Sequence, residues 1–263
     1  MRNAIVTTIV IFIAAQVSGQ IVATRSSSPQ FLIPAAGAQA GIGGTFFRSD
    51  ITIVNYRPVD QRIRLQWLPQ NATGVGVPAI ETMIAASSGI ASEDFVTTVM
   101  QKSGLGAILV TGIDANGAFD PGAQLVATSR IWTPEPGTTG TTSQSLPAIS
   151  TNDVASGTSS VLGARRDSRY RTNVGIVNIS LSPQTYRVIV FGTFGTEIQQ
   201  VDVPAFSMVL FGVTGASSTT PLQIQVQNVS TGSTAFVAYA SSIDNVTGDA
   251  WTTLGSNVPV PTP

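Results

Sequence analysis

Residues 47–55 read Phe-Arg-Ser-Asp-Ile-Thr-Ile-Val-Asn, and residues 170–178 read Tyr-Arg-Thr-Asn-Val-Gly-Ile-Val-Asn. The two segments are identical or chemically close at every position except one, where Thr52 aligns with Gly175. So long an ordered match between distant parts of one chain is the signature of an internal repeat. The pair of segments therefore predicts two related structural units.

Each half of the chain reads as a series of β-strands. Ile51 and Ile53 would share one face of the first repeated segment, because side chains alternate along a strand. The next strand places Ile63, Leu65 and Trp67 on one face and polar side chains on the other. Asn-Gly and Pro-Gly turn signals separate such runs at short intervals. This spacing predicts an all-β, antiparallel sandwich in each half.

The alignment also predicts where the two units begin and end. The alignment that pairs Phe47 with Tyr170 also pairs Ile63 with Tyr186 in the next strand. Near the end of each unit, Leu125–Ala127 matches Phe236–Ala238. The segment between the two halves is rich in Pro, Gly and Thr, which is typical of a linker. The expected boundaries are 30–133 for the first sandwich, 134–145 for the linker and 146–256 for the second sandwich.

The repeated motif resembles a known group of proteins. An aromatic residue, Arg, Ser or Thr, and Asp or Asn, followed by alternating apolar residues and Asn, is similar to the immunoglobulin-like repeats of bacterial secreted proteins. The resemblance covers most of both halves. It implies tandem immunoglobulin-like sandwiches and a surface or matrix role, and it brings no catalytic residues with it.

The N-terminus has the pattern of a cleaved secretory signal. Arg2 precedes the uncharged segment Ala4–Ala15, and Val17 and Gly19 are small residues where signal peptidase reads them. The alternative, a membrane-spanning helix, needs about 20 apolar residues. We therefore expect a signal peptide over residues 1–19, a mature chain from Gln20 without a membrane span, and a secreted, extracellular or periplasmic location.

Composition excludes several classes of function. The chain has no histidine and no cysteine, and its net charge is −1. A Ser-His-Asp triad, a cysteine nucleophile and a His-ligated metal are therefore excluded, and nucleic acid has no electrostatic attraction to the chain. The adjacent carboxylates Glu93 and Asp94 leave glycoside hydrolysis as the open enzymatic alternative, but neighbouring residues on a strand point to opposite faces. We expect a non-catalytic protein without a resident cofactor.

Two turn segments are rich in side-chain oxygens and are candidates for calcium, which takes six to eight oxygen ligands. The competing interpretation is that these side chains cap the backbone of their own turns. The candidate metal ligands are Asp114, Asn116, Asp120, Asp244 and Asp249.

Two sets of residues are candidates for ligand binding. Arg165, Arg166 and Arg169 would suit an anionic polysaccharide or a phosphate group, because guanidinium groups match such anions. The alternative is a solvated loop. Trp132 and Trp251 lie at predicted strand ends and offer flat rings for sugar stacking, or else they seal the ends of the sandwiches. These residues support the rival hypothesis of a carbohydrate-binding module that recognises an extracellular polysaccharide.

The preferred expectation is a structural or adhesive protein of the cell surface or extracellular matrix. Its partner would be a polysaccharide or protein, and uncovered sheet edges would allow self-association by strand addition. The outward positions of the second unit hold Ile189 and Phe191, where the first unit has Gln66 and Leu68. This added apolar surface would form a contact either between the two units or between protomers, and we expect the contact between the units.

Overall fold

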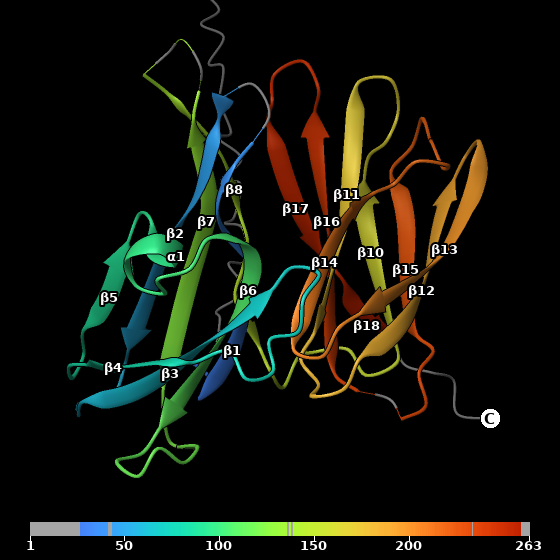
Figure 1. Ribbon diagram of the computed structural model, residues 1–263. Coiled ribbons are helices and arrows are strands. Elements are labelled where there is room, and N and C mark those ends of the chain that lie inside the picture. The colour runs from blue at the N-terminus through green and yellow to red at the C-terminus, as the bar shows by residue number, and fades with distance from the viewer. Residues whose placement is uncertain (1–26, 42–43, 136, 138, 233, 259–263) are drawn as a thin grey trace, which may run out of the picture.

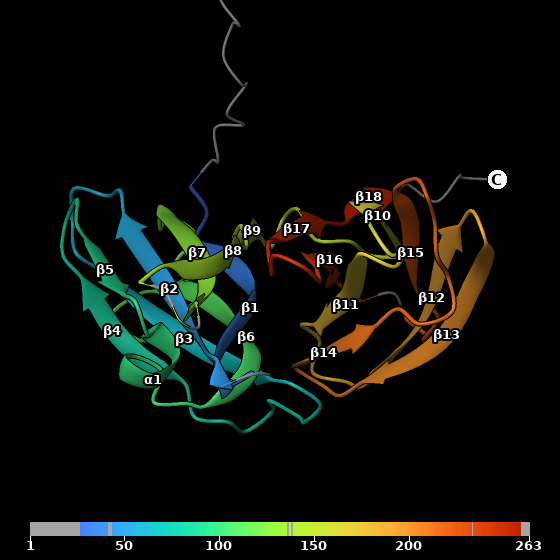
Figure 2. The ribbon, with the colours of Figure 1, turned by 90° about the horizontal axis from the view of Figure 1, so that it is seen from above.

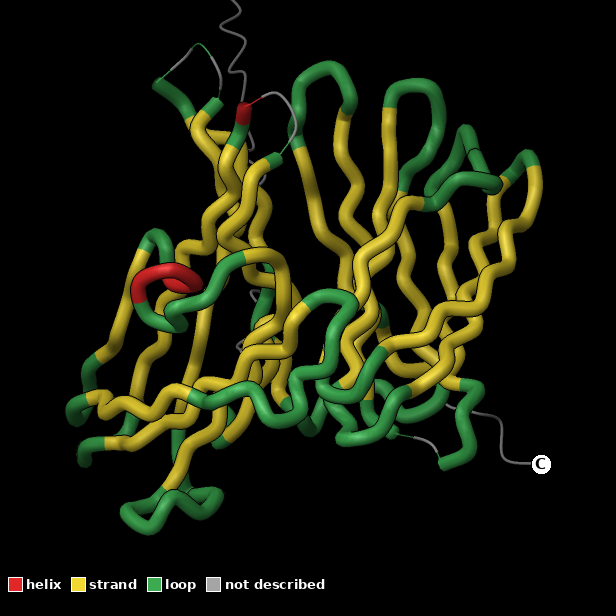
Figure 3. Tube along the Cα trace, viewed as in Figure 1, coloured by secondary structure: helices red, strands yellow, loops and turns green. Residues whose placement is uncertain are grey.

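The computed structural model describes residues 27–41, 44–135, 137, 139–232 and 234–258. Strands dominate it, as Figure 3 shows, and the paired strands run antiparallel. The four-residue helix α1, Phe95–Thr98, follows strand β5. The described residues include no helix long and apolar enough to cross a membrane. The predicted signal peptide, residues 1–19, lies outside the described part of the chain.

The first unit consists of two antiparallel layers (Figures 1 and 2). Sheet I has the order β4-β3-β6-β1-β9, and sheet II has the order β5-β2-β7-β8. β1 also pairs with the start of β2, at Gln39↔Phe47 and Ala40↔Phe46, and so joins the two layers. The strands are β1 Gln30–Ala40, β2 Phe46–Asn55, β3 Gln61–Pro69, β4 Ile80–Ile84, β5 Gly89–Ser92, β6 Gly104–Ile113, β7 Leu125–Pro134, β8 Thr141–Ser145 and β9 Ile149–Ser150.

The second unit has the same strand order. Sheet III runs β13-β12-β15-β10-β18, and sheet IV runs β14-β11-β16-β17. Each strand of the second unit occupies the place of the strand nine numbers earlier in the first. The strands are β10 Thr158–Ala164, β11 Tyr170–Asn178, β12 Gln184–Gly192, β13 Gly195–Val203, β14 Ser207–Gly212, β15 Leu222–Asn228, β16 Phe236–Asp244, β17 Ala250–Leu254 and β18 Ser256–Val258.

Alternating side chains fill the space between the layers of each unit. On β3, Ile63 and Leu65 are fully buried and Trp67 is 4% exposed, and they meet Ile51 and Ile53 from β2 in one apolar cluster. A separate cluster fills the second unit. Burial of each such side chain stabilises the fold by about 1.5–3 kcal/mol.

The last residue of the repeated motif ties the two layers together at one end of each unit. Asn55 and Asn178 are both fully buried, and each side-chain amide donates to three backbone carbonyl groups. The Oδ1 atom of each also accepts a backbone N–H, from Arg57 or Ser180 at 2.9 Å. The acceptors are Val59, Ile84 and Ala85 in the first unit and Ser182, Val203 and Pro204 in the second.

The segment expected to be a linker, residues 134–145, does not run free between the units. It contains the turn after β7 and strand β8, which pairs with β7 at Thr133↔Thr142. In the strand order of the units β8 corresponds to β17. β8 is an edge strand of sequence Thr-Thr-Ser-Gln-Ser, and little of it is buried. It therefore needs no apolar side chains, and its composition resembles that of a linker. Strand pairing, which composition does not encode, places it in sheet II.

The two units pack together through an apolar contact between the outer face of sheet I and the outer face of sheet IV. Backbone hydrogen bonding extends this contact, because the N–H of Asn71 donates to the carbonyl of Met208 at 2.9 Å. The hydroxyl of Ser207 donates to the carbonyl of Pro69 at 2.8 Å. The buried side chains of this contact are Leu32, Ala35, Leu68, Ala107, Leu109, Leu146, Val177, Phe206, Met208, Val237 and Tyr239.

Ile189 and Phe191, the residues expected at this contact, belong instead to the outer face of sheet III. Phe191 is 39% exposed, whereas the aligned Leu68 is fully buried between the units. The first unit contributes its five-stranded sheet to the contact, and the second unit contributes its four-stranded sheet. The contact is therefore made by different faces of the two units, and a local gain in apolar residues does not identify it.

Candidate functional site

The arginine cluster lies in the loop between β10 and β11, and one of its members holds neighbouring backbone. Nε of Arg166 donates to the carbonyl of Val213 at 2.6 Å, and its Nη1 donates to the carbonyl of Ala216 at 2.9 Å. Both carbonyl groups belong to the segment after β14. Arg166 therefore links two loops of the second unit.

Arg169 pairs with a carboxylate that the sequence had grouped with the metal candidates. Its Nε and Nη2 atoms lie 2.8 Å and 2.6 Å from Oδ2 of Asp244. The hydrogen bond from Arg169 is the main reason that the pKa of Asp244 lies below its usual value, and the backbone N–H of Val246 adds to it. The same hydrogen bond raises the pKa of Arg169. Loop 165–169 is thereby fastened to the end of β16.

Tyr170 brings three of the predicted ligand-binding residues together. The guanidinium carbons of Arg165 and Arg169 lie 5.6 Å and 5.3 Å from the centre of its ring. The ring of Trp251 meets it edge-on, with centroids 5.7 Å apart. The sequence analysis did not identify Tyr170 as a site residue. Its position as the aromatic residue that begins the second repeated segment was the available signal. The four side chains form one aromatic–arginine cluster at an end of the second unit.

Trp132 belongs to a different cluster in the first unit. Its indole N–H donates to the carbonyl of Glu93 at 2.9 Å. Arg48 and Arg130 lie 5.7 Å and 5.9 Å from its ring, and Arg48 also pairs with Asp94 at 3.5 Å. The two candidate tryptophans therefore belong to different clusters. Each is placed by contacts within its own unit, and Trp251 donates its N–H to the carbonyl of Gly163 at 3.4 Å.

The candidate metal ligands of the first unit lie in the loop between β6 and β7. Oδ1 of Asp114 accepts the backbone N–H groups of Asn116 and Ala118 at 2.8 Å and 2.9 Å. Asp120 accepts from Gly122 at 2.9 Å and pairs with Arg57 at 2.6 Å. Burial raises the pKa of Asp120, but these hydrogen bonds outweigh it and leave the pKa below its usual value. Both carboxylates hold their own loop.

The second group of candidate ligands lies in the loop between β16 and β17. Oδ1 of Asp244 accepts the backbone N–H of Val246 at 2.8 Å, and the N–H of Asp249 donates to the hydroxyl of Thr247 at 3.2 Å. Across the described ranges, no three or more His, Cys, Asp or Glu side chains are grouped to hold a metal ion. Calcium binding stays a prediction.

Glu197 occupies an anion-binding turn that sequence reasoning missed. Its Oε2 atom accepts backbone N–H groups from Thr214, Gly215 and Ala216 at 3.0 Å, 2.6 Å and 3.2 Å. Burial raises the pKa of Glu197, yet these three donors bring it below the usual value. Successive N–H groups of this kind bind anions, and here the anion is the chain's own carboxylate.

A groove of about 750 Å³ runs between the two units, beside their apolar contact. One wall is the outer face of sheet IV with the loop between β16 and β17. The other wall is formed by β1, the start of β2 and the β7–β8 hairpin. None of the candidate ligand or metal residues lines it. The lining residues are Ala35, Gly37, Gln39, Gly41, Thr45, Phe47, Leu105, Ile131, Thr133, Pro134, Glu135, Thr142, Ser143, Gln144, Arg171, Asn173, Leu210, Tyr239, Ser241, Ile243, Val246, Thr247, Gly248 and Ala250.

Tyr239 lines this groove from sheet IV. It is 1% exposed, and its hydroxyl has no hydrogen-bond partner among the described residues. Burial raises the pKa of Tyr239 far above its ordinary value, so the group is a neutral O–H donor. Nearby, the hydroxyl of Ser241 donates to Oε1 of Gln144 across the two units at 2.9 Å. A buried polar group without a partner calls for an explanation.

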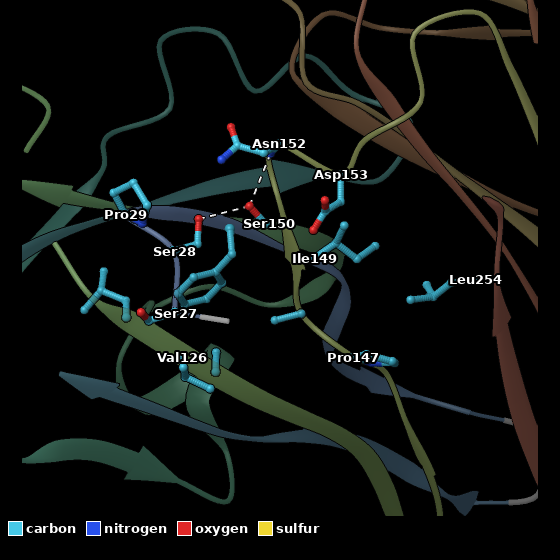
Figure 4. Close-up of a pocket in the computed structure, with 14 residues that line it drawn as sticks. Ser27, Ser28, Pro29, Val126, Pro147, Ile149, Ser150, Asn152, Asp153 and Leu254 are labelled. Atoms are coloured by element: carbon cyan, nitrogen blue, oxygen red, sulfur yellow. Dashed lines mark hydrogen bonds between the residues drawn. The ribbon is translucent and has the colours of Figure 1, made fainter. Parts of the chain in front are cut away.

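A smaller pocket of about 510 Å³ lies where the chain enters the first unit (Figure 4). The hydroxyls of Ser28 and Ser150 are 3.0 Å apart, and the backbone N–H of Asn152 donates to Ser150 at 3.2 Å. Leu254 reaches the pocket from β17 of the second unit. The polar groups that Figure 4 joins by dashed lines satisfy one another, so this pocket carries a weaker case for a ligand than the groove does.

Comparison with known proteins names no family. No protein-family model and no curated protein matches the sequence. The crystal structure of Thermotoga maritima 1070 is 13% identical in sequence and has a TM-score of 0.34. That match covers 40% of this chain and 96% of the other. A likeness this weak carries no argument about function.

Proposed function

We propose that the chain is an exported, non-catalytic adhesive or structural protein of the cell surface or extracellular matrix, built from two tandem immunoglobulin-like sandwiches. The observation that carries this proposal is the apolar contact between sheets I and IV. It joins two similar units into one body, which is what a protein that presents a surface at a fixed orientation requires.

The use of the charged side chains supports a non-catalytic role. Arg166, Arg169 and Glu197 hold loops of the second unit, and Asp120 does so in the first. A catalytic acid or base needs a proton that it can exchange near the operating pH. The pKa values of Asp120, Glu197 and Asp244 are instead lowered by hydrogen bonds that hold the fold.

Export is the part of the proposal that can be tested first. Expression of the full chain in a bacterium with two membranes is expected to give a periplasmic or secreted product that begins at Gln20. A charge placed in the apolar segment, as in Ile9→Asp, is expected to leave the unprocessed chain inside the cell. Cell fractionation and N-terminal sequencing read both results, and an unprocessed cytoplasmic wild-type chain would overturn the export proposal.

The adhesive role needs its own measurement. The exported chain, coated on a surface, is expected to retain bacterial cells or extracellular matrix material, and the soluble chain is expected to compete with this retention. An exported chain that retains neither would contradict the adhesive role while leaving export intact.

Carbohydrate recognition is the second candidate function, and the groove between the units favours it. A concave site of this size is typical of small-ligand binding sites, which range over roughly 300–1,000 Å³. Trp132, Trp251 and the arginine cluster do not line this groove, and they make contacts within their own units. The groove is therefore a separate candidate site for a sugar.

A further inference from the structure

We propose that the outer face of sheet III docks a second copy of the chain, on the outer face of that copy's sheet II. Such a contact would repeat between chains the contact that sheets I and IV make within one chain. The inference rests on the proposed structural role and deepens it by naming the partner and the surface. The chains would assemble head to tail, because the two faces that meet are different.

The two proposed faces are the repeat equivalents of the faces that already meet inside the chain. Sheet III has the strand order of sheet I, and sheet II has that of sheet IV. The contact within the chain uses sheet I of the first unit and sheet IV of the second, so sheets II and III are left without a partner unit. The strands of sheet III lie on the side of the second unit that faces away from the first (Figures 1 and 2). A contact between unlike faces can be repeated from chain to chain, since each chain keeps one free face of each kind.

The outer face of sheet III exposes large apolar side chains. Phe191 is 39% exposed, and Ile198 and Leu162 are 56% and 59% exposed. Ile198 pairs directly with Ile189, and Phe191 is the next outward residue of β12. Leu162 and Phe191 both pair with Gln223 of β15, one from each side. Apolar side chains gathered in this way on one exposed face are typical of a surface that binds another protein.

The contact within the chain shows which residues of the two sheets come close together. Leu68 of sheet I and Met208 of sheet IV are both fully buried in it. The residues after Leu68 bind the strand that carries Met208: Pro69 accepts the hydroxyl of Ser207, and the N–H of Asn71 donates to the carbonyl of Met208. The end of β3 therefore lies beside β14.

The aligned positions of the two free faces are matched in size. Phe191 in sheet III aligns with Leu68 and is larger. In sheet II, Gly89 aligns with Met208 and is smaller, since each pairs with the penultimate residue of the repeated motif. Gly89 and Ala91, the next outward residue of β5, are both exposed. The larger ring of one chain would therefore lie where the other chain has small side chains, which keeps the packed volume similar.

The free faces are more polar at their centres than the faces buried within the chain. Leu109 of sheet I aligns with Gln225 of sheet III, and Tyr239 of sheet IV aligns with Thr128 of sheet II. Sheet III also lacks the loop 70–79, whose backbone hydrogen-bonds to sheet IV, because a short turn joins β12 to β13. Contacts between partners that also exist apart are more polar than permanent ones. We therefore expect the contact between chains to be reversible.

The charges of the two faces favour a neutral contact over binding to a charged macromolecule. Arg187 and Asp202 lie at outward positions of sheet III and have opposite signs. The outward arginines of sheet II are engaged in ion pairs at 3.4 Å and 3.5 Å, Arg130 with Asp50 and Arg48 with Asp94. The two faces can therefore approach each other without net repulsion, and neither has the excess charge that would select an oppositely charged polymer.

The decisive test uses one substitution on each face. Phe191→Asp places a carboxylate on sheet III and leaves sheet II intact, and Thr128→Asp does the reverse. Both side chains are exposed, so the fold is expected to tolerate either change. Leu181→Asp is the matched control, because Leu181 is 75% exposed in the turn between β11 and β12 and belongs to neither sheet. Circular dichroism verifies that each variant is folded.

Analytical ultracentrifugation and light scattering would follow the purified chain from micromolar to millimolar concentration. We expect the mean mass of the wild type and of Leu181→Asp to grow with concentration beyond that of a dimer, because a head-to-tail contact leaves a free face at each end. Phe191→Asp and Thr128→Asp are each expected to stay monomeric. An equimolar mixture of these two variants is expected to form a heterodimer and nothing larger, since each chain keeps one of the two complementary faces.

Three results would overturn the proposal. One is a wild-type chain that stays monomeric at millimolar concentration. Another is assembly that stops at a dimer and that Phe191→Asp abolishes while Thr128→Asp does not, which would mean that sheet III pairs with its own copy. The third is a pair of face variants that assemble like the wild type or stay monomeric when mixed. Export and cell retention are measured separately, so their failure is distinguishable from a failure here.

Discussion

The ring of Tyr239 lies across the backbone of Gly175 on the neighbouring strand of sheet IV. A Cβ atom on Gly175 would lie 2.1 Å from Cζ and 2.5 Å from the hydroxyl oxygen of Tyr239. The two residues are direct partners in the pairing of β11 with β16, and their counterparts in the first unit are the paired residues Thr52 and Thr128. Gly175, the one mismatch in the repeated motif, is therefore accompanied by a second difference on the paired strand, Tyr239 in place of Thr128. Both differences occur where sheet IV is buried against the first unit.

Gly175→Ala is expected to destabilise the protein by about 2 kcal/mol, because the new methyl group must displace the ring of Tyr239. Gly212→Ala is the matched control on the adjacent strand, since a Cβ atom there meets nothing nearer than Oδ1 of Asn173 at 3.6 Å. Urea denaturation measures both variants. Equal effects of the two substitutions would show that Tyr239 does not depend on the glycine.

Tyr186→Phe is expected to stabilise the protein by about 1 kcal/mol. The substitution keeps the ring, whose centroid lies 4.9 Å from that of Phe236, and removes a buried hydroxyl that has no partner in the described part of the chain. The measurement is the denaturant midpoint at constant slope. A loss of stability would mean that the hydroxyl has a partner, such as a buried water molecule.

Asn178→Ala is expected to cost about 3 kcal/mol, because it removes a fully buried amide that donates to three backbone carbonyl groups. Asn55→Ala is expected to behave alike in the first unit. The exposed Asn116→Ala serves as control and is expected to change stability by less than about 0.5 kcal/mol. Thermal unfolding compares the three variants. A tolerated change at Asn178 would remove this explanation of the repeated motif.

Leu68→Asp and Phe191→Asp test the contact between the units at two aligned positions. Leu68 is buried in the contact, so a carboxylate there is expected to destabilise the chain by several kcal/mol or to separate the units. Phe191 is 39% exposed, and its replacement is expected to have little effect on stability. Small-angle scattering and proteolysis follow the separation. The reverse order of effects would place the contact at sheet III.

Stability is expected to fall with acid and to be nearly constant between pH 6 and 8. The pKa values of Glu81, Asp120, Glu197 and Asp244 are all lowered in the folded chain. A lowered folded pKa means that the stabilisation is complete above the unfolded value of about 4 and is lost as pH falls through the folded value. No histidine titrates at neutral pH.

Denaturation curves from pH 2 to 8 measure this dependence. Asp244→Asn is expected to lower stability at pH 7 and to make the acid dependence shallower, because Arg169 loses its charged partner. An unchanged slope for Asp244→Asn would mean that the pair with Arg169 does not contribute to the acid sensitivity.

The alternation of residues such as Ile63, Leu65 and Trp67 was enough to predict antiparallel strands and which face of each is buried. This works because the side-chain period of a strand is a local property of the backbone. The aligned segments likewise pointed to two units, and the structure shows the same strand order in both. Charge and the lack of His and Cys excluded whole classes of chemistry, because a missing side chain cannot be replaced by folding.

Only the tertiary structure decided which faces of the units meet and where a groove lies. The outer face of a strand reads alike whether water or another sheet covers it, so Phe191 looked as suitable for the contact as Leu68. The same limit applied to the charged residues, since Arg169 and Asp244 are 75 positions apart in sequence and 2.6 Å apart in space. The geometry of the loops decides which charged residues form ion pairs of this kind. No local pattern in the sequence predicts that geometry.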